Sequence, residues 1–136
     1  MSDELDKVLG LISRALYDEG EVSELGCSEL ESSVMWKLAE TLTPGKKIRS
    51  IRNWQWWYIT FPEGVDVPEY LSPSMVYSDN LIADSSGILY AGNWVRSTLL
   101  LNFHKECLFE TENSFYLLVG KGTQKTVDAK TAFSLY

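Results

Sequence analysis

The sequence predicts an α+β fold, with two N-terminal helices packed on a mostly antiparallel sheet of about five strands. Two amphipathic helical patterns come first, and a tryptophan-rich run at 51–61 follows with the composition of a central strand. Short β-type segments separated by turn residues occupy most of the remaining chain. This order of elements is typical of an α+β domain, here ending in a short helical turn. The 136 residues have the length of a single domain, 1–136.

Both helices have recognisable ends. The first is expected to begin at Ser2 or Asp3 and to end before Gly20, with its apolar stripe at Leu5, Val8, Leu9, Ile12 and Leu16. The second begins at a capping box, in which Ser28 accepts a hydrogen bond from the backbone and Glu31 reaches back. Its predicted buried stripe consists of Leu30, Val34, Leu38 and Leu42, widened by Met35 and Ala39. The run Thr43-Pro44-Gly45 ends it.

The run at 51–61 is too aromatic and too β-branched for a surface loop, so it is predicted to be the central strand. Alternation along a strand places Trp54, Trp56, Tyr58 and Thr60 on one face. The other face receives Asn53, Gln55, Trp57, Ile59 and Phe61. Because both faces carry large apolar groups, both are expected to be covered.

Turn residues divide the second half of the chain. An extended segment from Met75 is expected to continue to Ala83, to turn at 84–87 and to return at 88–90 as a hairpin. A second hairpin is predicted between 107 and 119, with Asn113 able to adopt a positive φ in its turn. Asp128 can cap a last short helix, from which Ala129, Ala132 and Phe133 pack back.

Twelve basic and nineteen acidic residues give a net charge of -7. Nucleic acids and anionic membranes attract basic surfaces, so direct binding to either is not expected. A basic protein partner, such as one that handles nucleic acid, is compatible with this charge. The N-terminus has no secretion signal, and no apolar run reaches the roughly 18 residues of a membrane span. With two distant cysteines, these features predict a cytoplasmic protein.

The sequence contains no complete catalytic or metal-binding motif. Gly120-Lys121-Gly122-Thr123 resembles the tail of a phosphate loop but lacks the opening glycine, since Phe115 stands there. His104 and Cys107 form a nucleophile pair only if a turn brings their side chains together. One histidine and two distant cysteines do not supply a zinc site, and no cofactor is implied. The basic residues Lys46, Lys47, Arg49 and Arg52 either contact single-stranded nucleic acid or pair with carboxylates.

Trp94 and Arg96 are the strongest candidates for recognition. They are neighbours on one face if the segment is extended. Arginine binds a carboxylate or phosphate with two parallel hydrogen bonds, and an adjacent indole adds a cation–π contact. The alternative is a structural pairing of Arg96 with Glu106, Glu110 or Glu112 inside the fold.

Several short motifs resemble a family of small bacterial proteins known only as a domain of unknown function. The motifs are Trp94-Val95-Arg96-Ser97-Thr98, then Cys107-Leu108-Phe109-Glu110-Thr111-Glu112-Asn113, and Tyr116-Leu117-Leu118-Val119-Gly120. Gly26-Cys27, Pro44-Gly45 and the pair Trp54 and Trp56 are also similar to it. The resemblance implies one compact bacterial domain and no particular activity.

Two function classes remain open. The first is a small binding or inhibitor protein that works by protein–protein contact, as immunity proteins and phage-encoded inhibitors of host defence do. Its motivating features are small size, acidity, abundant aromatic residues and the missing catalytic set. The second is a small-ligand-binding domain or enzyme with an aromatic pocket. The candidate partner- or ligand-binding residues are Trp94, Arg96, Trp54, Trp56 and Tyr58.

Overall fold

The computed structural model describes residues 2–18 and 20–134, and for residues 2–5 only the backbone. Within this part the helices are α1 (Ser2–Tyr17), α2 (Glu29–Leu42) and α3 (Ala129–Ala132). The strands are β1 (Glu21–Ser23), β2 (Lys47–Arg52), β3 (Gln55–Thr60), β4 (Ser74–Ser78), β5 (Asn80–Asp84), β6 (Val95–Arg96), β7 (Asn102–His104), β8 (Leu108–Glu110), β9 (Ser114–Leu118) and β10 (Gly122–Asp128). The predicted α+β class, with two N-terminal helices and a short C-terminal helix, is confirmed.

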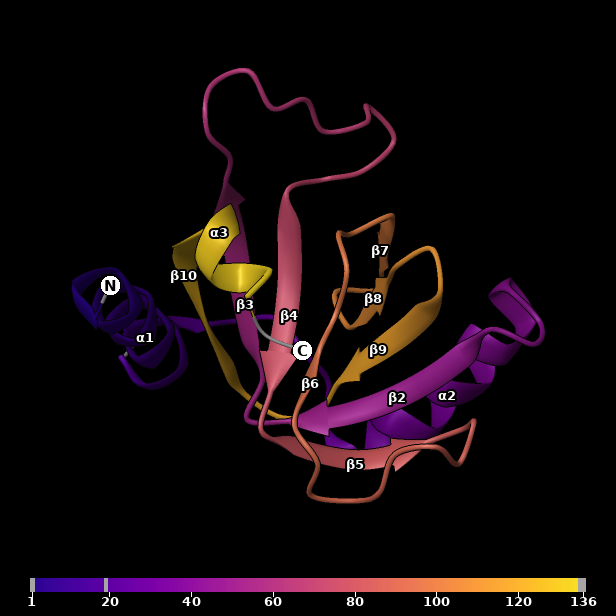
Figure 1. Cartoon of the computed structure of the whole chain (residues 1–136). Coiled ribbons are helices and arrows are strands. Elements are labelled where there is room, and N and C mark those ends of the chain that lie inside the picture. The colour runs from indigo at the N-terminus through magenta and orange to yellow at the C-terminus, as the bar shows by residue number, and fades with distance from the viewer. Residues whose placement is uncertain (1, 19, 135–136) are drawn as a thin grey trace.

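The strands form two sheets of five strands each (Figure 1). The first sheet has the order β1-β10-β3-β4-β6, and the second has the order β5-β2-β9-β8-β7. Most pairings are antiparallel, but β10 pairs with β3, and β2 with β9, in parallel. The structure therefore divides the predicted sheet into two.

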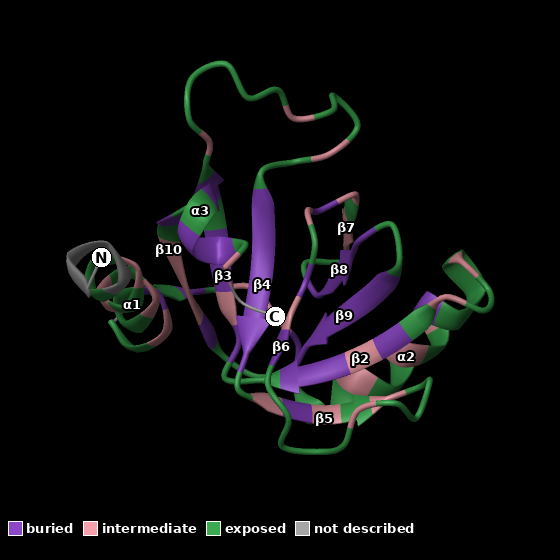
Figure 2. Ribbon diagram, viewed as in Figure 1, coloured by how far each residue is buried: buried purple, intermediate pink, exposed green. Residues whose placement is uncertain are grey.

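Three apolar cores account for the layers. One core lies between the sheets and includes Trp54, Trp56 and Phe109. On the outer face of the first sheet, Trp57 and Ile59 pack with Ala15 of α1 and Ala132 of α3, among others. On the outer face of the second sheet, α2 packs over Ile48, Leu108, Phe115 and Leu117. Figure 2 shows the result, with buried strands at the centre and exposed helix surfaces on either side.

The tryptophan-rich run belongs to two strands. β2 ends at Arg52, the backbone takes a positive φ of 49° at Asn53, and β3 begins at Gln55 in the other sheet. The predicted single strand at 51–61 is therefore wrong at its start, because a left-handed residue ends the extended backbone. The predicted alternation is confirmed: Trp54 and Trp56 face the core between the sheets, while Trp57 and Ile59 face the helices. β3 is the middle strand of its sheet.

The helices form as predicted, and their buried faces match the predicted stripes in part. The capping box of Ser28 and Glu31 is confirmed. α2 turns Ala39 toward the second sheet, with Met35 and Leu38 partly buried beside it, whereas Leu30 is 89% exposed. Val34 and Leu42 are also exposed, as is Leu9 on α1. Residues four apart drift around a helix with 3.6 residues per turn, so one straight stripe cannot stay buried along its length.

One of the two predicted hairpins is confirmed. β8 and β9 pair as expected, although positive φ angles occur at Lys105 and Glu106 and not at Asn113. The turn at 84–87 also forms, with the Gly87 amide donating to the Asp84 carbonyl at 3.0 Å. The returning strand at 88–90 is wrong, because that segment is irregular, and β4 and β5 lie in different sheets. α3 begins after Asp128 as expected, although this side chain accepts from Thr131 and not from the backbone.

Candidate functional site

The five candidate binding residues do not share one surface. Trp54 is 1% and Trp56 is 6% exposed, and both lie in the core between the sheets. Tyr58 lies on β3 and Trp94 directly precedes β6, and each of the two side chains is 44% exposed. The rings of Trp56 and Tyr58 also contact each other, with centroids 6.2 Å apart. Of the five residues, Trp94 and Arg96 line a groove.

This groove, which we name the arginine groove, lies where β6 meets the second sheet. It has a volume of about 360 Å³ and is lined by Arg49, Leu89, Asn93, Trp94, Val95 and Arg96. β6 is the edge strand of the first sheet and pairs with β4 through Tyr77 opposite Arg96. Arg49 comes from β2 in the second sheet, so the groove joins two arginines that the sequence separates widely. The ring of Trp94 packs against that of Tyr77, with centroids 6.3 Å apart.

Arg49 has incomplete polar contacts. Its Nη1 donates to the hydroxyl of Tyr116 at 3.3 Å, and its Nε lies 3.6 Å from Oδ2 of Asp84. The second distance is too long for a hydrogen bond, and the buried Nε has no acceptor among the described residues. Asp84 already accepts from the amide and hydroxyl of Ser86 and from the amide of Leu89. Its carboxylate therefore serves mainly the turn at 84–87.

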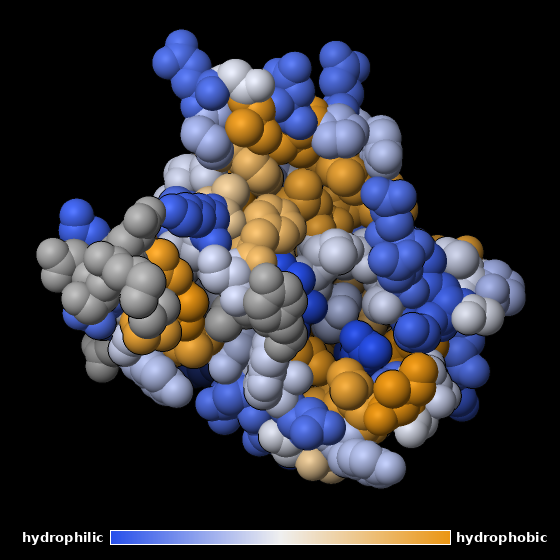
Figure 3. All heavy atoms as spheres, in the orientation of Figure 1, coloured by the Kyte–Doolittle hydropathy of each residue, from blue (hydrophilic) through white to orange (hydrophobic). Residues whose placement is uncertain are grey.

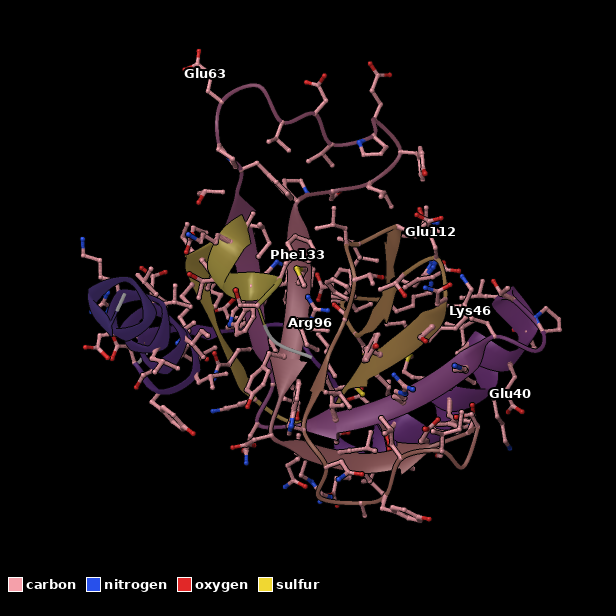
Figure 4. All side chains as sticks on the ribbon, viewed as in Figure 1. Glu40, Lys46, Glu63, Arg96, Glu112 and Phe133 are labelled. Atoms are coloured by element: carbon pink, nitrogen blue, oxygen red, sulfur yellow. The ribbon has the colours of Figure 1, made fainter. Side chains whose placement is uncertain are left out.

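Arg96 is held in place by the C-terminal helix. Its Nη1 donates to the carbonyl of Ala132 at 3.2 Å, and its guanidinium carbon lies 5.4 Å from the ring centroid of Phe133. Figure 4 shows the two side chains next to each other in front of the first sheet. Burial lowers the pKa of Arg96. Within the described part of the chain no carboxylate forms an ion pair with Arg96, so the predicted pairing with Glu106, Glu110 or Glu112 is wrong.

Glu110 instead belongs to a separate polar cluster. Lys46 Nζ lies 2.7 Å from its Oε2, Thr43 donates to the same oxygen at 3.2 Å, and His104 Nε2 lies 2.8 Å from its Oε1. Burial by itself raises the pKa of Glu110, but the hydrogen bonds from Lys46 and His104 bring it below the ordinary value. With every oxygen matched by donors, this cluster is a structural one.

His104 and Cys107 do not form a nucleophile pair. His104 is engaged with Glu110, while the thiol of Cys107 donates to the Leu118 carbonyl at 3.6 Å and interacts with Cys27. Burial raises the pKa of both cysteine thiols, which disfavours the reactive thiolate. Among the described residues, no group of three or more histidine, cysteine, aspartate or glutamate side chains is placed to hold a metal ion.

The predicted basic cluster is mostly neutralised. Lys46 pairs with Glu110, Arg49 with Asp84 and Arg52 with Glu29. This matches the interpretation in which the cations pair with carboxylates. None of the described helices is both long and apolar enough to cross a membrane.

The loop 61–73, which we name the acidic loop, was not among the candidate binding residues predicted from the sequence. It joins the paired strands β3 and β4 and stands away from both sheets, as Figures 1 and 4 show, with Glu63 near its outer end. Glu63, Asp66 and Glu69 are exposed along it, together with Val65 and Tyr70, and the loop contains no lysine or arginine. In Figure 3 hydrophilic groups project at the outer end of this loop, with hydrophobic surface directly beneath them. The available signal was the set of Pro62, Pro68 and Pro73 around three carboxylates.

One protein family matches most of the chain. The family is described as a domain of unknown function, DUF6957, and the match covers residues 25–134. The chain belongs to this family. The DUF6957 region starts just before α2 and ends just after α3, so it contains the acidic loop and every residue that lines the arginine groove. No match was found among curated proteins or among solved structures.

Proposed function

We propose that this DUF6957 protein is a small acidic binding protein of the bacterial cytoplasm that acts by protein–protein contact through its acidic loop. The loop itself is the observation that carries this proposal. Two antiparallel neighbours such as β3 and β4 need a connection of only about 2–5 residues. Connections longer than about 12 residues are uncommon and are usually functional or disordered. Here the loop contains three prolines, which restrict its backbone and lower the entropy lost on binding.

The composition of the loop favours a basic partner. Its three carboxylates face solvent without a neighbouring cation in the loop, and the whole chain has a net charge of -7. Complementary charge speeds the encounter with a basic protein and fixes its orientation. The exposed ring of Tyr70 supplies an aromatic anchor of the kind that contributes most to interfaces. Immunity proteins and phage-encoded inhibitors of host defence act in this way, by occupying the surface of a partner protein, and the comparison is one of function class.

The test compares two double variants with the same charge change. Glu63→Gln with Glu69→Gln removes two of the three carboxylates of the acidic loop. Glu40→Gln with Glu112→Gln removes two exposed carboxylates outside the loop, on α2 and in the β8–β9 turn (Figure 4). Proteins that co-purify with the tagged chain are quantified by mass spectrometry for each form, and the enriched partner is then titrated.

The loop variant should lose at least about tenfold in affinity, and its association rate should lose much of its salt dependence. The control variant should stay within about threefold of the parent. If the parent captures no partner above an unrelated acidic protein, the proposal fails. If both variants lose the same affinity, net charge and not the loop carries the binding.

A second function class is favoured by a specific observation, the arginine groove. Its volume of about 360 Å³ lies in the range of small-ligand sites, and its lining combines arginine with apolar residues. This feature supports binding of a small ligand at a place separate from the acidic loop.

A further inference from the structure

We propose that the arginine groove binds an oxyanion, a carboxylate or phosphate group, carried on a flat apolar body. This site lies beyond the proposed contact through the acidic loop and shares no residue with it. The ligand is defined here by the chemistry of the groove. Two guanidinium groups supply donors for the anion, while Trp94 and Leu89 supply apolar surface for the rest of the molecule.

The charge balance of the groove is the first argument. The chain as a whole is acidic, yet this groove brings together Arg49 from one sheet and Arg96 from the other. Asp84 is the carboxylate that pairs with Arg49, and none of the described carboxylates pairs with Arg96. Among the described residues, two positive groups and one negative group leave an excess of one positive charge. A partly buried cation without a counter-ion destabilises the fold, and a bound anion removes that penalty.

The unmatched donors are the second argument. A guanidinium has five N–H donors. Arg96 uses one of them on the Ala132 carbonyl, and Arg49 uses one on the Tyr116 hydroxyl. The buried Nε of Arg49 has no acceptor among the described residues. An oxyanion offers several acceptor lone pairs in the forked geometry that guanidinium groups prefer.

The third argument is that Arg96 is already positioned. The ring of Phe133 lies against its guanidinium, and the Ala132 carbonyl fixes one end of it. A side chain held in this way loses less rotamer freedom when a ligand binds. A purely structural clamp of α3 onto β6 would need the contact with Ala132 but no excess of charge in the groove. This difference makes the proposal testable.

The experiment is a titration of the full ¹⁵N-labelled chain, followed by NMR. The probes are benzoate and phenyl phosphate, with acetate and inorganic phosphate as bare anions and benzamide as the neutral analogue. Benzoate or phenyl phosphate should shift the signals of Arg49 and Arg96 Nε, of Trp94 Nε1 and of the Asn93 amide in a saturable manner. The bare anions should bind at least about tenfold more weakly, and benzamide should not bind. The ratio of benzoate to phenyl phosphate affinity tells whether carboxylate or phosphate is preferred.

Matched variants test the role of charge. Arg96→Gln should weaken the better probe at least about tenfold, whereas Arg52→Gln should stay within about twofold. Arg52 is the suitable control because it lies on β2 like Arg49 but pairs with Glu29 outside the groove. Truncation after Ser134 removes two residues and keeps every residue that lines the groove. In this shortened chain the probes should bind in the same order of affinity. Chemical-shift mapping on the parent chain keeps the test valid if Arg96→Gln does not fold.

Three outcomes overturn the proposal. The first is that no probe produces saturable shifts at the groove. The second is that benzamide binds as well as benzoate, which would leave an apolar groove without anion recognition. The third is that folded Arg96→Gln binds like Arg52→Gln. Neutralising Glu63 and Glu69 should leave probe affinity unchanged, so a failure of the acidic-loop proposal is measured separately.

Discussion

Gly122 is the residue whose replacement most directly tests the packing between the two sheets. A Cβ at this position would lie 2.2 Å from Cδ2 and 2.4 Å from both Cε2 and Cε3 of Trp54. Optimal carbon contacts are about 3.5–4.0 Å, so the overlap exceeds an ångström along the fused edge of the ring. The glycine is thus required by the tryptophan that faces it, because the backbone of β10 passes directly over the indole.

The ring has little room to move away. Trp54 is buried, and its Nε1 donates to the Gly120 carbonyl at 3.1 Å. On another side its Cζ2 would be only 3.1 Å from a Cβ at Gly26. Gly122→Ala must therefore shift β10 or distort the ring, and overpacking of this kind destabilises proteins by about 1–3 kcal/mol. For a chain of this size that loss lowers Tm by roughly 3–12 °C.

Urea unfolding measures the effect, and Gly10→Ala is the matched control. Gly10 lies within α1 with no atom close to its would-be Cβ, so this change should stabilise by about 0.5–1 kcal/mol through helix propensity. In the Trp54→Leu background, Gly122→Ala should cost at least about 1 kcal/mol less than it costs in the parent, because the side chain that clashes with the new Cβ is gone. A Gly122→Ala protein as stable as the parent, or an equal loss in the Trp54→Leu background, would refute the reasoning.

Three further predictions concern stability and reactivity. Glu110→Gln should destabilise by about 3 kcal/mol at pH 7 by breaking a buried ion pair. The pKa of Glu110 lies below its ordinary 4.5 in the folded protein, so this difference should persist above pH 4.5 and shrink as pH falls further, as followed by urea midpoints. Ser28→Ala should remove about 1 kcal/mol from the stability of α2 in thermal melts, whereas Ser33→Ala on its exposed face should be neutral. Cys27 and Cys107 should react with a thiol reagent at pH 8 only after unfolding, because burial raises both thiol pKa values; rapid labelling of folded protein would contradict their placement.

Local patterns predicted the elements whose causes are local. The capping box at Ser28 and the pairing of β8 with β9 depend on residues close in sequence, and both are confirmed. The two sheets depend on parallel pairings between distant segments, such as Ile48 with Phe115 and Gln55 with Thr123. No short window of sequence contains such pairings, because they follow from the packing of the whole chain.

β10 shows why a strand can be missed when strands are predicted from hydrophobic patterns. Its sequence from Gly122 to Asp128 is largely polar, with Val127 as its one large apolar residue in the core. The polar side chains are accommodated by neighbouring backbone. Lys125 Nζ donates to the carbonyls of Arg14 and Asp18 at the C-terminal end of α1, where a helix favours a cation. The strand is stabilised by its two neighbours and by this contact, and little by an apolar face.

The candidate site was predictable only where it depends on residues close in sequence. Trp94 and Arg96 are two residues apart, and their adjacency follows from any extended backbone. Arg49 joins them only because β2 and β6 meet across two sheets. The burial of Trp54 and Trp56 likewise depends on the second sheet, which covers the face that those residues present.

The point at which the chain changes sheets gives the last prediction. Asn53 is exposed, has a φ of 49° and separates β2 from β3. Glycine adopts this left-handed conformation freely, asparagine tolerates it, and alanine is strained there by about 1 kcal/mol. Asn53→Ala should therefore lower the free energy of unfolding by about that amount, whereas Asn53→Gly should stay within about 0.5 kcal/mol of the parent. Urea unfolding of the two variants gives the comparison. If alanine were tolerated as well as glycine, the corner would not depend on this backbone conformation, and the division of 51–61 between two sheets would need another cause.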